Sequence, residues 1–428
     1  MQPVGTPPAS ASPVSSGWFA RTRRWWILAT LFGATFLNYF DRQTLSVAIE
    51  PISREFGLTT ADRGTLLAAF VYAYALAHLF IGFIIDRVRN IRFFFAFMVI
   101  GWSLCTVLVG FATSHTQILW LRYALGVFEA ANFPLCLLLI ARIFPARQRS
   151  LAAGIFNSGA VLATLAAPKL VIFFSTEFNW RYSFYVTGAL GLVWLVPWLL
   201  ISPPAPPKGG IAAVAHLPEK GKMAVPPFGG VGRLPAFWII TLIGIGLLPG
   251  WYFMSQWLPT YLTQTWNVAY NQSLGDRLTM VYLVQDVGLW VGGGLVWWLS
   301  RRGLTVLSAR KAVIFGAYAM MMSILLLPRM ESMEATLAVL CVYVFGLAAW
   351  QASQQAFKQD ILPGRVATVA ALVGFAETLS SAFLVQKVGQ VVQETGGFNA
   401  IFWLLAGCFT VAVVGVVCLQ KQWLTFNE

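Results

Sequence analysis

Charge is scarce in this sequence. Only 11% of its 428 residues are Asp, Glu, Lys or Arg, against about 25% in a typical soluble domain. Acids are the rarer charged type, with 16 Asp and Glu beside 29 Lys and Arg. Apolar side chains make up 58% of the chain, and its mean hydropathy is +0.70. This composition excludes an ordinary soluble globular protein and predicts a chain largely embedded in a lipid bilayer.

Histidine and cysteine are also sparse. The 3 histidines are isolated in the sequence, and neither a zinc-protease motif nor a phosphate-binding loop is present. The 5 cysteines are scattered without metal or redox spacing, which favours buried free thiols. A membrane enzyme needs a nucleophile, a metal or a cofactor constellation, so we expect neither enzymatic activity nor a cofactor.

Apolar stretches dominate the rest of the chain. A transmembrane helix needs about 20 mostly apolar residues. Twelve stretches meet this length: 24–48, 64–85, 92–112, 116–141, 150–174, 182–201, 235–262, 278–299, 309–328, 335–357, 366–389 and 398–419. The sequence therefore predicts an all-α membrane protein with twelve transmembrane helices.

A segment rich in Pro and Gly, 202–232, separates six predicted spans from six. The predicted domains are a disordered tail over 1–23, a six-helix bundle over 24–201, a linker over 202–232, a second six-helix bundle over 233–420 and a short tail over 421–428. The first apolar stretch is too long for a signal peptide and lacks a small-residue cleavage site, so we expect it to be retained as a helix.

The positive charge is unevenly placed. With the N-terminus in the cytoplasm, most Lys and Arg fall at cytoplasmic helix ends. They include Arg21, Arg23, Arg24, Arg87, Arg89, Arg92, Arg147, Arg149, Arg301, Arg302, Arg310 and Lys311. This bias predicts cytoplasmic termini and linker, and it explains the net charge of +13 without a nucleic-acid partner.

The two halves carry a weak internal repeat. Tyr39-Phe40-Asp41-Arg42-Gln43 in the first span is similar to Tyr252-Phe253-Met254-Ser255-Gln256 in the seventh, and Pro145-Ala146-Arg147 is similar to Pro363-Gly364-Arg365. The charged pair of the first match occurs only in the N-terminal half. We therefore expect the first half to carry the ion chemistry and the second mainly to shape the pocket.

Two acids stand inside predicted spans, each with an arginine nearby. Arg42 follows Asp41 directly, and Arg122 precedes Glu129 by two helical turns on the same face. A bare carboxylate in hydrocarbon is costly, so it normally pairs, faces a cavity or takes up a proton. This pattern predicts a site that handles a proton and an anion together, and structural ion pairs are the alternative.

Several segments resemble a known family. The loop Gly82-Phe83-Ile84-Ile85-Asp86-Arg87-Val88-Arg89-Asn90-Ile91-Arg92 resembles the signature loop of the major facilitator superfamily. Within it, NYFDRQ, GVFEAANFP, FPARQRSLAAGIFNSG and FNWRYSFYVTGALGLVW resemble the anion:cation symporter family, hexuronate-transporter-like branch. The resemblance is sharp over residues 36–195 and looser in the second half.

This resemblance implies two pseudo-symmetric six-helix bundles in a bacterial inner membrane, monomeric, importing an organic anion with protons by alternating access. The implied substrate is a sugar acid such as a hexuronate or an aldonate. Asp41 and Glu129 would couple protons, Arg42 and Arg122 would face the anion, and Tyr39 and Tyr74 would line the pocket.

Three departures from the family pattern stand out. Leu138 occupies a position where the family commonly has a lysine, which affects the choice of anion. The second signature loop, Gly294-Leu295-Val296-Trp297-Trp298, lacks its acid. Glu377 in the eleventh span is not expected from the family, and we consider it an extra titrating group together with Asp286.

Further residues are assigned by type and position. The mixture of aromatic faces and polar donors suits a sugar-like or aromatic acid, which adds to the pocket Asn157, Tyr252, Gln256 and Trp350. A cytoplasmic conformational latch is predicted from Asp86, Arg87, Arg89 and Arg92. His78 is interpreted as a packing histidine one turn after Tyr74.

Other functions remain open at this point. An aromatic or dicarboxylic acid is an alternative substrate, and a drug/proton antiporter or a nutrient sensor of the same fold is an alternative class. An antiporter of cations would use the acids without an anion-holding arginine, so it should tolerate neutral residues at 42 and 122. A channel would show a pore ring or filter segment, which is not evident.

Overall fold

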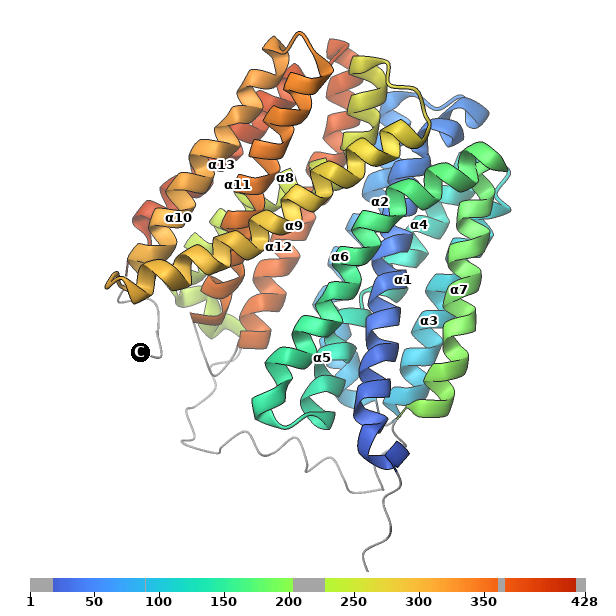
Figure 1. Ribbon diagram of the computed structural model, residues 1–428, viewed down its shortest axis with the longest axis vertical. Coiled ribbons are helices and arrows are strands. Elements are labelled where there is room, and N and C mark those ends of the chain that lie inside the picture. The colour runs from blue at the N-terminus through green and yellow to red at the C-terminus, as the bar shows by residue number, and fades with distance from the viewer. Residues whose placement is uncertain (1–17, 89, 203–227, 361–365, 421–428) are drawn as a thin grey trace, which may run out of the picture.

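The computed structural model describes residues 18–88, 90–202, 228–360 and 366–420, and within these it is helical throughout (Figure 1). The N-terminal half contains α1 (Trp18–Phe56), α2 (Thr60–Arg87), α3 (Ile91–Gly110), α4 (His115–Glu129), α5 (Asn132–Ile143), α6 (Ala146–Glu177) and α7 (Trp180–Ile201).

The C-terminal half opens on a short 3-10 helix, η2 (Phe228–Arg233). It continues through α8 (Pro235–Trp266), α9 (Gln272–Arg301), α10 (Val306–Met321), η3 (Met322–Arg329), α11 (Met333–Asp360), α12 (Val366–Thr395) and α13 (Asn399–Cys418).

The predicted twelve membrane crossings are confirmed. Eleven segments are long and apolar enough to cross a membrane, with α4 and α5 forming one of them and α10 and η3 another. The twelfth crossing is α1, a helix of 39 residues that carries Asn38, Asp41 and Arg42 in its middle. These polar side chains make α1 the least apolar crossing.

Two element boundaries differ from the sequence prediction. α1 begins at Trp18, so residues 18–23 are helical and not part of the predicted tail. The fourth span is divided, because α4 ends at Glu129 and α5 begins at Asn132. Pro134 accounts for this break, since its ring clashes with the carbonyl four residues earlier, at Ala130. The predicted tails, residues 1–17 and 421–428, and most of the linker, residues 203–227, lie outside the described residues.

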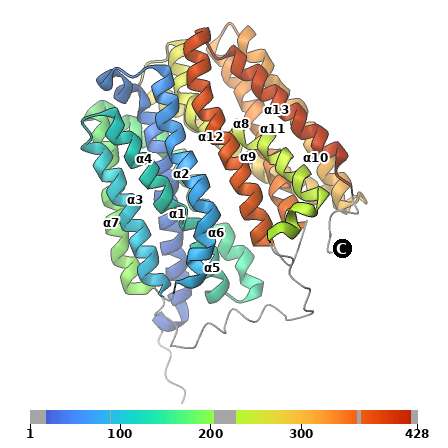
Figure 2. The ribbon, with the colours of Figure 1, turned by 180° about the vertical axis from the view of Figure 1, so that it is seen from behind.

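The halves stand side by side as two helix bundles, and both views show them converging toward one end (Figures 1 and 2). We call the end at which α1 begins and α13 ends the proximal end, and the opposite end the distal end.

Polar contacts between the halves gather at the distal end. Tyr72 of α2 donates its hydroxyl to Gln386 Oε1 of α12 at 2.9 Å, and the Ala61 N–H donates to Gln393 Oε1. On the other side of the interface, Lys169 of α6 forms an ion pair of 2.8 Å with Asp276 of α9. Thr279 also donates to the Leu165 carbonyl. The distal end is therefore closed by direct contact between the halves.

Close helix packing sets the position of the polar residues in the N-terminal half. A Cβ at Gly126 of α4 would lie 2.5 Å from the Phe70 carbonyl of α2, so only glycine allows this approach. Gly159 brings α6 equally close to Phe32 of α1. Glu129, nearly one turn beyond Gly126, is thereby placed beside α1 and α2.

Candidate functional site

An ion pair between α1 and α4 is the centre of the site. Arg42 Nε donates to Glu129 Oε2 at 2.8 Å. The Glu129 side chain is fully buried, whereas 15% of the Arg42 side chain is exposed. Because the two residues are far apart in sequence, the pair depends on tertiary packing, in which α4 lies against α2 and α3. An incoming anion could therefore reach the arginine but not the carboxylate behind it.

Aromatic rings surround the Arg42 guanidinium. Its Cζ lies 4.7 Å from the ring centroid of Tyr39, 5.2 Å from that of Phe70 and 4.4 Å from that of Tyr74. Tyr252 of α8 lies in electrostatic range of the same guanidinium, so the C-terminal half also reaches the site. Cation–π contacts hold a guanidinium without consuming its hydrogen-bond donors. These donors remain able to bind an anion.

Asp41 and Arg122 form a deeper part of the site. Asp41 is 2% exposed and Arg122 is 1% exposed. No hydrogen bond within the described residues reaches Asp41 Oδ1 or any of the three guanidinium nitrogens of Arg122. Arg122 Cζ lies 5.0 Å from the Phe70 ring, and its charge interacts with both Asp41 and Glu129. Two acids and two arginines thus occupy one buried region.

The pairing differs from what the sequence spacing suggests. Glu129 bonds to Arg42 and not to Arg122, although Arg122 is two turns away on its own helix. Asp41 interacts electrostatically with Arg122, whereas the hydrogen bond of the adjacent Arg42 goes to Glu129. Sequence analysis also missed Phe70, which contacts both arginines. Its position one turn before Tyr74 on α2 is the signal that could have identified it.

Among the described residues, no hydrogen bond joins the remaining predicted pocket residues to the Arg42–Glu129 pair. Gln256 and Trp350 are buried, with Gln256 Oε1 and Trp350 Nε1 unpartnered among the described residues. Asn157 of α6 is exposed and donates to the Ala153 carbonyl. His78 stacks at 5.1 Å on Tyr74, as a packing histidine would. Their roles in binding stay predictions.

The predicted latch is described only in part. Arg92 donates to the Leu199 carbonyl, and its own carbonyl accepts from Trp198 Nε1 at 2.9 Å, so it ties α3 to the end of α7. Arg87 is exposed at the end of α2. Arg89 and the side chain of Asp86 lie outside the described part of the chain.

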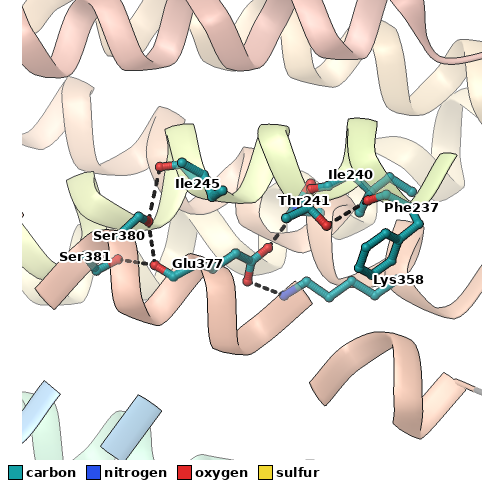
Figure 3. A network of polar contacts seen from close by, with 9 residues as sticks. Phe237, Ile240, Thr241, Ile245, Lys358, Glu377, Ser380 and Ser381 are labelled. Atoms are coloured by element: carbon teal, nitrogen blue, oxygen red, sulfur yellow. Dashed lines mark hydrogen bonds and ion pairs between the residues drawn. The ribbon is translucent and has the colours of Figure 1, made fainter. Parts of the chain in front are cut away.

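A second buried charge cluster lies in the C-terminal half (Figure 3). Lys358 Nζ of α11 donates to Glu377 Oε2 of α12 at 2.6 Å. Gln354 Nε2 donates to Glu377 Oε1 at 3.0 Å and to the Ile240 carbonyl of α8 at 3.1 Å. Sequence analysis did not identify Lys358 as a partner of Glu377, because the two residues belong to different helices.

This cluster is separate from the Arg42 site. Along α8, Ile240 and Tyr252 are about 18 Å apart at 1.5 Å per residue. Asp286 of α9 is also buried and has Oδ2 without a partner among the described residues. Whether Glu377 or Asp286 titrates stays a prediction. In the described residues, no group of three or more His, Cys, Asp or Glu is arranged to hold a metal ion.

Comparison with known proteins identifies the class. The family model "Major Facilitator Superfamily" matches residues 31–385, and the chain belongs to this superfamily of membrane transporters. The fold agrees with the crystal structure of D-xylose-proton symporter, with a TM-score of 0.74 over 93% of this chain and 98% of that chain at 14% identity.

Several of the curated relatives are sugar-acid transporters. The chain is 31% identical to the D-galactonate transporter of Escherichia coli O6:H1 strain CFT073, over 68% of this chain and 71% of the relative. It is 26% identical to the hexuronate transporter of Escherichia coli K12, over 90% of each protein. The chain is thus a membrane transporter similar to organic-anion transporters, and the predicted family and non-enzymatic class are confirmed.

Proposed function

We propose that this protein imports a sugar acid together with protons across the bacterial inner membrane by alternating access. The Arg42–Glu129 ion pair is the observation that supports this proposal most directly. Arg42 is partly exposed and caged by aromatic rings, and its charge is already neutralised by a carboxylate that solvent does not reach.

Competition for Arg42 links the anion to the proton. A substrate carboxylate can take the guanidinium only when Glu129 releases it, and the released carboxylate would then be bare in a buried site. Because a buried unpaired charge is costly, Glu129 takes up a proton when the anion binds. Asp41 beside Arg122 provides a second position where an acid can take up a proton and release an arginine to the anion. With both acids protonated and a singly charged anion bound, the occupied site carries one net positive charge while the protein reorients.

The closed distal end supports the direction of transport. If the basic helix ends face the cytoplasm, as the positive-inside rule favours, the proximal end is cytoplasmic and the described conformation is closed toward the outside. Anion and protons would be released toward the cytoplasm from this conformation. The distal contacts would then open in the other half of the cycle.

The driving force is sufficient for accumulation. A singly charged anion moving with two protons carries one net positive charge inward, worth about 2.3 kcal/mol per 100 mV. At a membrane potential of about 150 mV this supports accumulation on the order of 300-fold, since about 1.4 kcal/mol is tenfold.

The substrate class follows from the relatives and the donors in the site. The relatives transport D-galactonate and hexuronates, both sugar acids. Tyr39, Tyr74 and Tyr252 offer hydroxyl groups near Arg42, and aromatic rings and hydroxyls together suit a polyhydroxylated carboxylate.

Uptake by the reconstituted protein tests the proposal. Proteoliposomes containing the full chain are given labelled D-galactonate or D-glucuronate with an inward proton gradient and then with the gradient collapsed. Accumulation that needs the gradient is the expected result. Equilibration of the anion regardless of the gradient would remove the coupling, and failure to transport either acid would remove the substrate class.

Asp41→Asn is expected to abolish accumulation driven by the membrane potential but to spare exchange of labelled for unlabelled substrate. The variant cannot release a proton at this position, so the potential-driven factor on the order of 300-fold is lost while binding at Arg42 persists. Counterflow and potential-driven net uptake, measured on the same proteoliposomes, separate the two steps. A variant whose accumulation still rises with the membrane potential contradicts the assignment of Asp41.

Glu129→Gln is expected to bind substrate with an affinity that no longer changes with pH. The amide resembles the protonated acid, so Arg42 stays free for the anion at every pH. Equilibrium binding of substrate to the variant and to wild type is measured between pH 5 and pH 8, in steps of about one pH unit. Glu394→Gln, an exposed position at the end of α12, is the matched control. Wild-type pH dependence in Glu129→Gln would assign the titration to another group.

A further inference from the structure

The turn between α9 and α10 carries two adjacent arginines, Arg301 and Arg302. From Val287 to Met330 the sequence contains neither Asp nor Glu. When Gly294 is aligned with Gly82 of the first signature loop, Trp298 occupies the place of Asp86 and Arg301 that of Arg89. Among the described residues, neither Arg301 nor Arg302 forms a hydrogen bond or ion pair with an acid.

Each of these arginines lies over a tryptophan one helical turn before it. Arg301 Cζ lies 4.2 Å from the Trp297 ring centroid, and Arg302 Cζ lies 4.5 Å from that of Trp298. The two rings are 58% and 45% exposed. Stacking fixes the position of a guanidinium and leaves its N–H donors directed outward. The turn therefore presents two fixed, adjacent cationic groups on the surface.

An apolar surface continues from these groups along α9. Val291, Leu295 and Trp298 are exposed and precede Arg302 at helical spacing, so they share its face. Trp290 is also exposed and lies two helical turns before Trp297 on the adjacent face of α9. α9 is among the least buried of the eleven candidate spans, and its end lies at the proximal end of the bundle, at the lower left in Figure 1. Two cationic side chains at the end of an exposed apolar helix face are suited to bind an amphipathic anion.

We propose that Arg301 and Arg302, with Trp297 and Trp298, form a binding site for an anionic phospholipid. The headgroup phosphate accepts hydrogen bonds from the two guanidinium groups, and the acyl chains lie along Val291 and Leu295. Tryptophan at a membrane interface and uncompensated arginines beside it are the groups that recognise such a lipid. Trp298, which stands at the position of the acid in the first signature loop, instead stacks under Arg302.

The occupant is a lipid and not a soluble phosphate or a protein. A soluble anion would gain nothing from the exposed stripe of α9, which lies within a candidate membrane span. The next cations along the chain have partners of their own: Arg310 Cζ lies 5.3 Å from the Phe357 ring centroid, and Lys311 donates to the Val417 and Leu419 carbonyls and so serves to hold α13. The site is therefore confined to the two stacked arginines.

Lipid binding by the purified full chain tests this site. Native mass spectrometry counts the lipids retained from mixtures of phosphatidylglycerol and phosphatidylcholine with identical acyl chains. Wild type is expected to retain phosphatidylglycerol preferentially, and Arg301→Gln/Arg302→Gln is expected to lose that preference by on the order of 30-fold, since each arginine near a membrane surface contributes about fivefold.

Matched variants separate this site from general charge. Arg142→Gln/Arg233→Gln removes the same charge from two other exposed positions and should keep the wild-type preference. Trp297→Leu/Trp298→Leu keeps the charge but removes the stacking, and it should weaken retention less than the arginine change. Equal loss in the Arg142/Arg233 control, or equal retention of both lipids by wild type, overturns the proposal. Displacement of the lipid by glycerol 3-phosphate alone would also overturn it, because the site would then recognise phosphate and not lipid.

Discussion

Gly64→Leu is expected to stop transport without unfolding the protein. Gly64 of α2 and Gly389 of α12 meet where the halves close the distal end. A Cβ at Gly64 would lie 2.9 Å from the Gln386 carbonyl, and one at Gly389 would lie 2.5 Å from the Thr60 carbonyl. Both obstacles are backbone atoms of the opposite half, which cannot move aside as a side chain can. A leucine there is incompatible with the closed distal end.

The physical consequence is a shift between conformations. Overpacking a tight helix contact costs about 1–3 kcal/mol or more, which is enough to reverse an equilibrium between two conformations of similar stability. Folding should survive because each half is held by contacts within itself, and leucine is a better helix former than glycine. Under the proposed alternating access, the variant stays open at the distal end and uptake falls at least about tenfold.

The measurement combines uptake with a distance across the closure. Spin labels are placed at Arg54 of α1 and Glu394 of α12, both exposed near the distal end. The distance between the labels should be longer in Gly64→Leu than in wild type. Gly407→Leu is the matched control, because a Cβ at Gly407 meets no atom within 4 Å. Normal uptake by a folded Gly64→Leu protein would show that transport does not need this contact.

The Gly64→Ala and Gly389→Ala variants test the same contact with a smaller side chain at two positions of different closeness. The smaller side chain requires a shift of a few tenths of an ångström at Gly64 and more at Gly389, where the opposing carbonyl is nearer. Uptake is therefore expected to fall more in Gly389→Ala than in Gly64→Ala. The order of the two effects distinguishes a steric block from a general loss of stability.

Sequence reasoning predicted the helices of this fold because hydropathy along a segment is a local property. It predicted where the spans lie and where the halves divide. It did not place the break in the fourth span, although Pro134 is the residue that causes it. Other prolines, such as Pro168 and Pro197, lie inside continuous helices, so packing decides whether a helix continues through a proline.

Sequence analysis predicted which charged residues form the site but not which of them form ion pairs with each other. The predicted charged residues do lie together, as expected because an isolated buried charge is costly: Asp41, Arg42, Arg122 and Glu129. Spacing suggested that Glu129 would meet Arg122 on its own helix, whereas in the folded bundle it accepts a hydrogen bond from Arg42 of α1. The Lys358–Glu377 pair joins different helices in the same way. Partners of this kind depend on tertiary packing, which a single sequence does not state.

Removing one partner of the Glu377–Lys358 pair is expected to cost about 3–5 kcal/mol of stability. Both side chains are nearly buried, at 3% and 6% exposed, so the remaining charge would have no solvent to compensate it. Glu377 is also confined by α8, because a Cβ at Gly244 would overlap its Oε1 atom. Glu377→Gln should therefore lower the thermal unfolding midpoint strongly, since Lys358 remains charged and unpaired.

The double variant Glu377→Gln/Lys358→Met should recover most of this loss. Neither substitution changes the side-chain volume much, and no bare charge remains. Replacing a whole buried pair by neutral groups is often close to neutral for stability. Thermal unfolding of the wild type, both single variants and the double variant gives the coupling energy directly. A double variant as unstable as Glu377→Gln alone would show that the cluster is needed for more than its charge balance.

The same double variant decides whether Glu377 takes part in proton coupling. If the carboxylate only balances Lys358, the double variant should concentrate substrate as well as wild type does under a proton gradient. If Glu377 is a titrating group of the transport cycle, a stable double variant should exchange substrate but fail to accumulate it. The position of the pair favours the first outcome, because it is bonded within one half and lies far along α8 from Tyr252. A charge pair that moves with its own bundle keeps its partner throughout the cycle and has no step at which to release a proton.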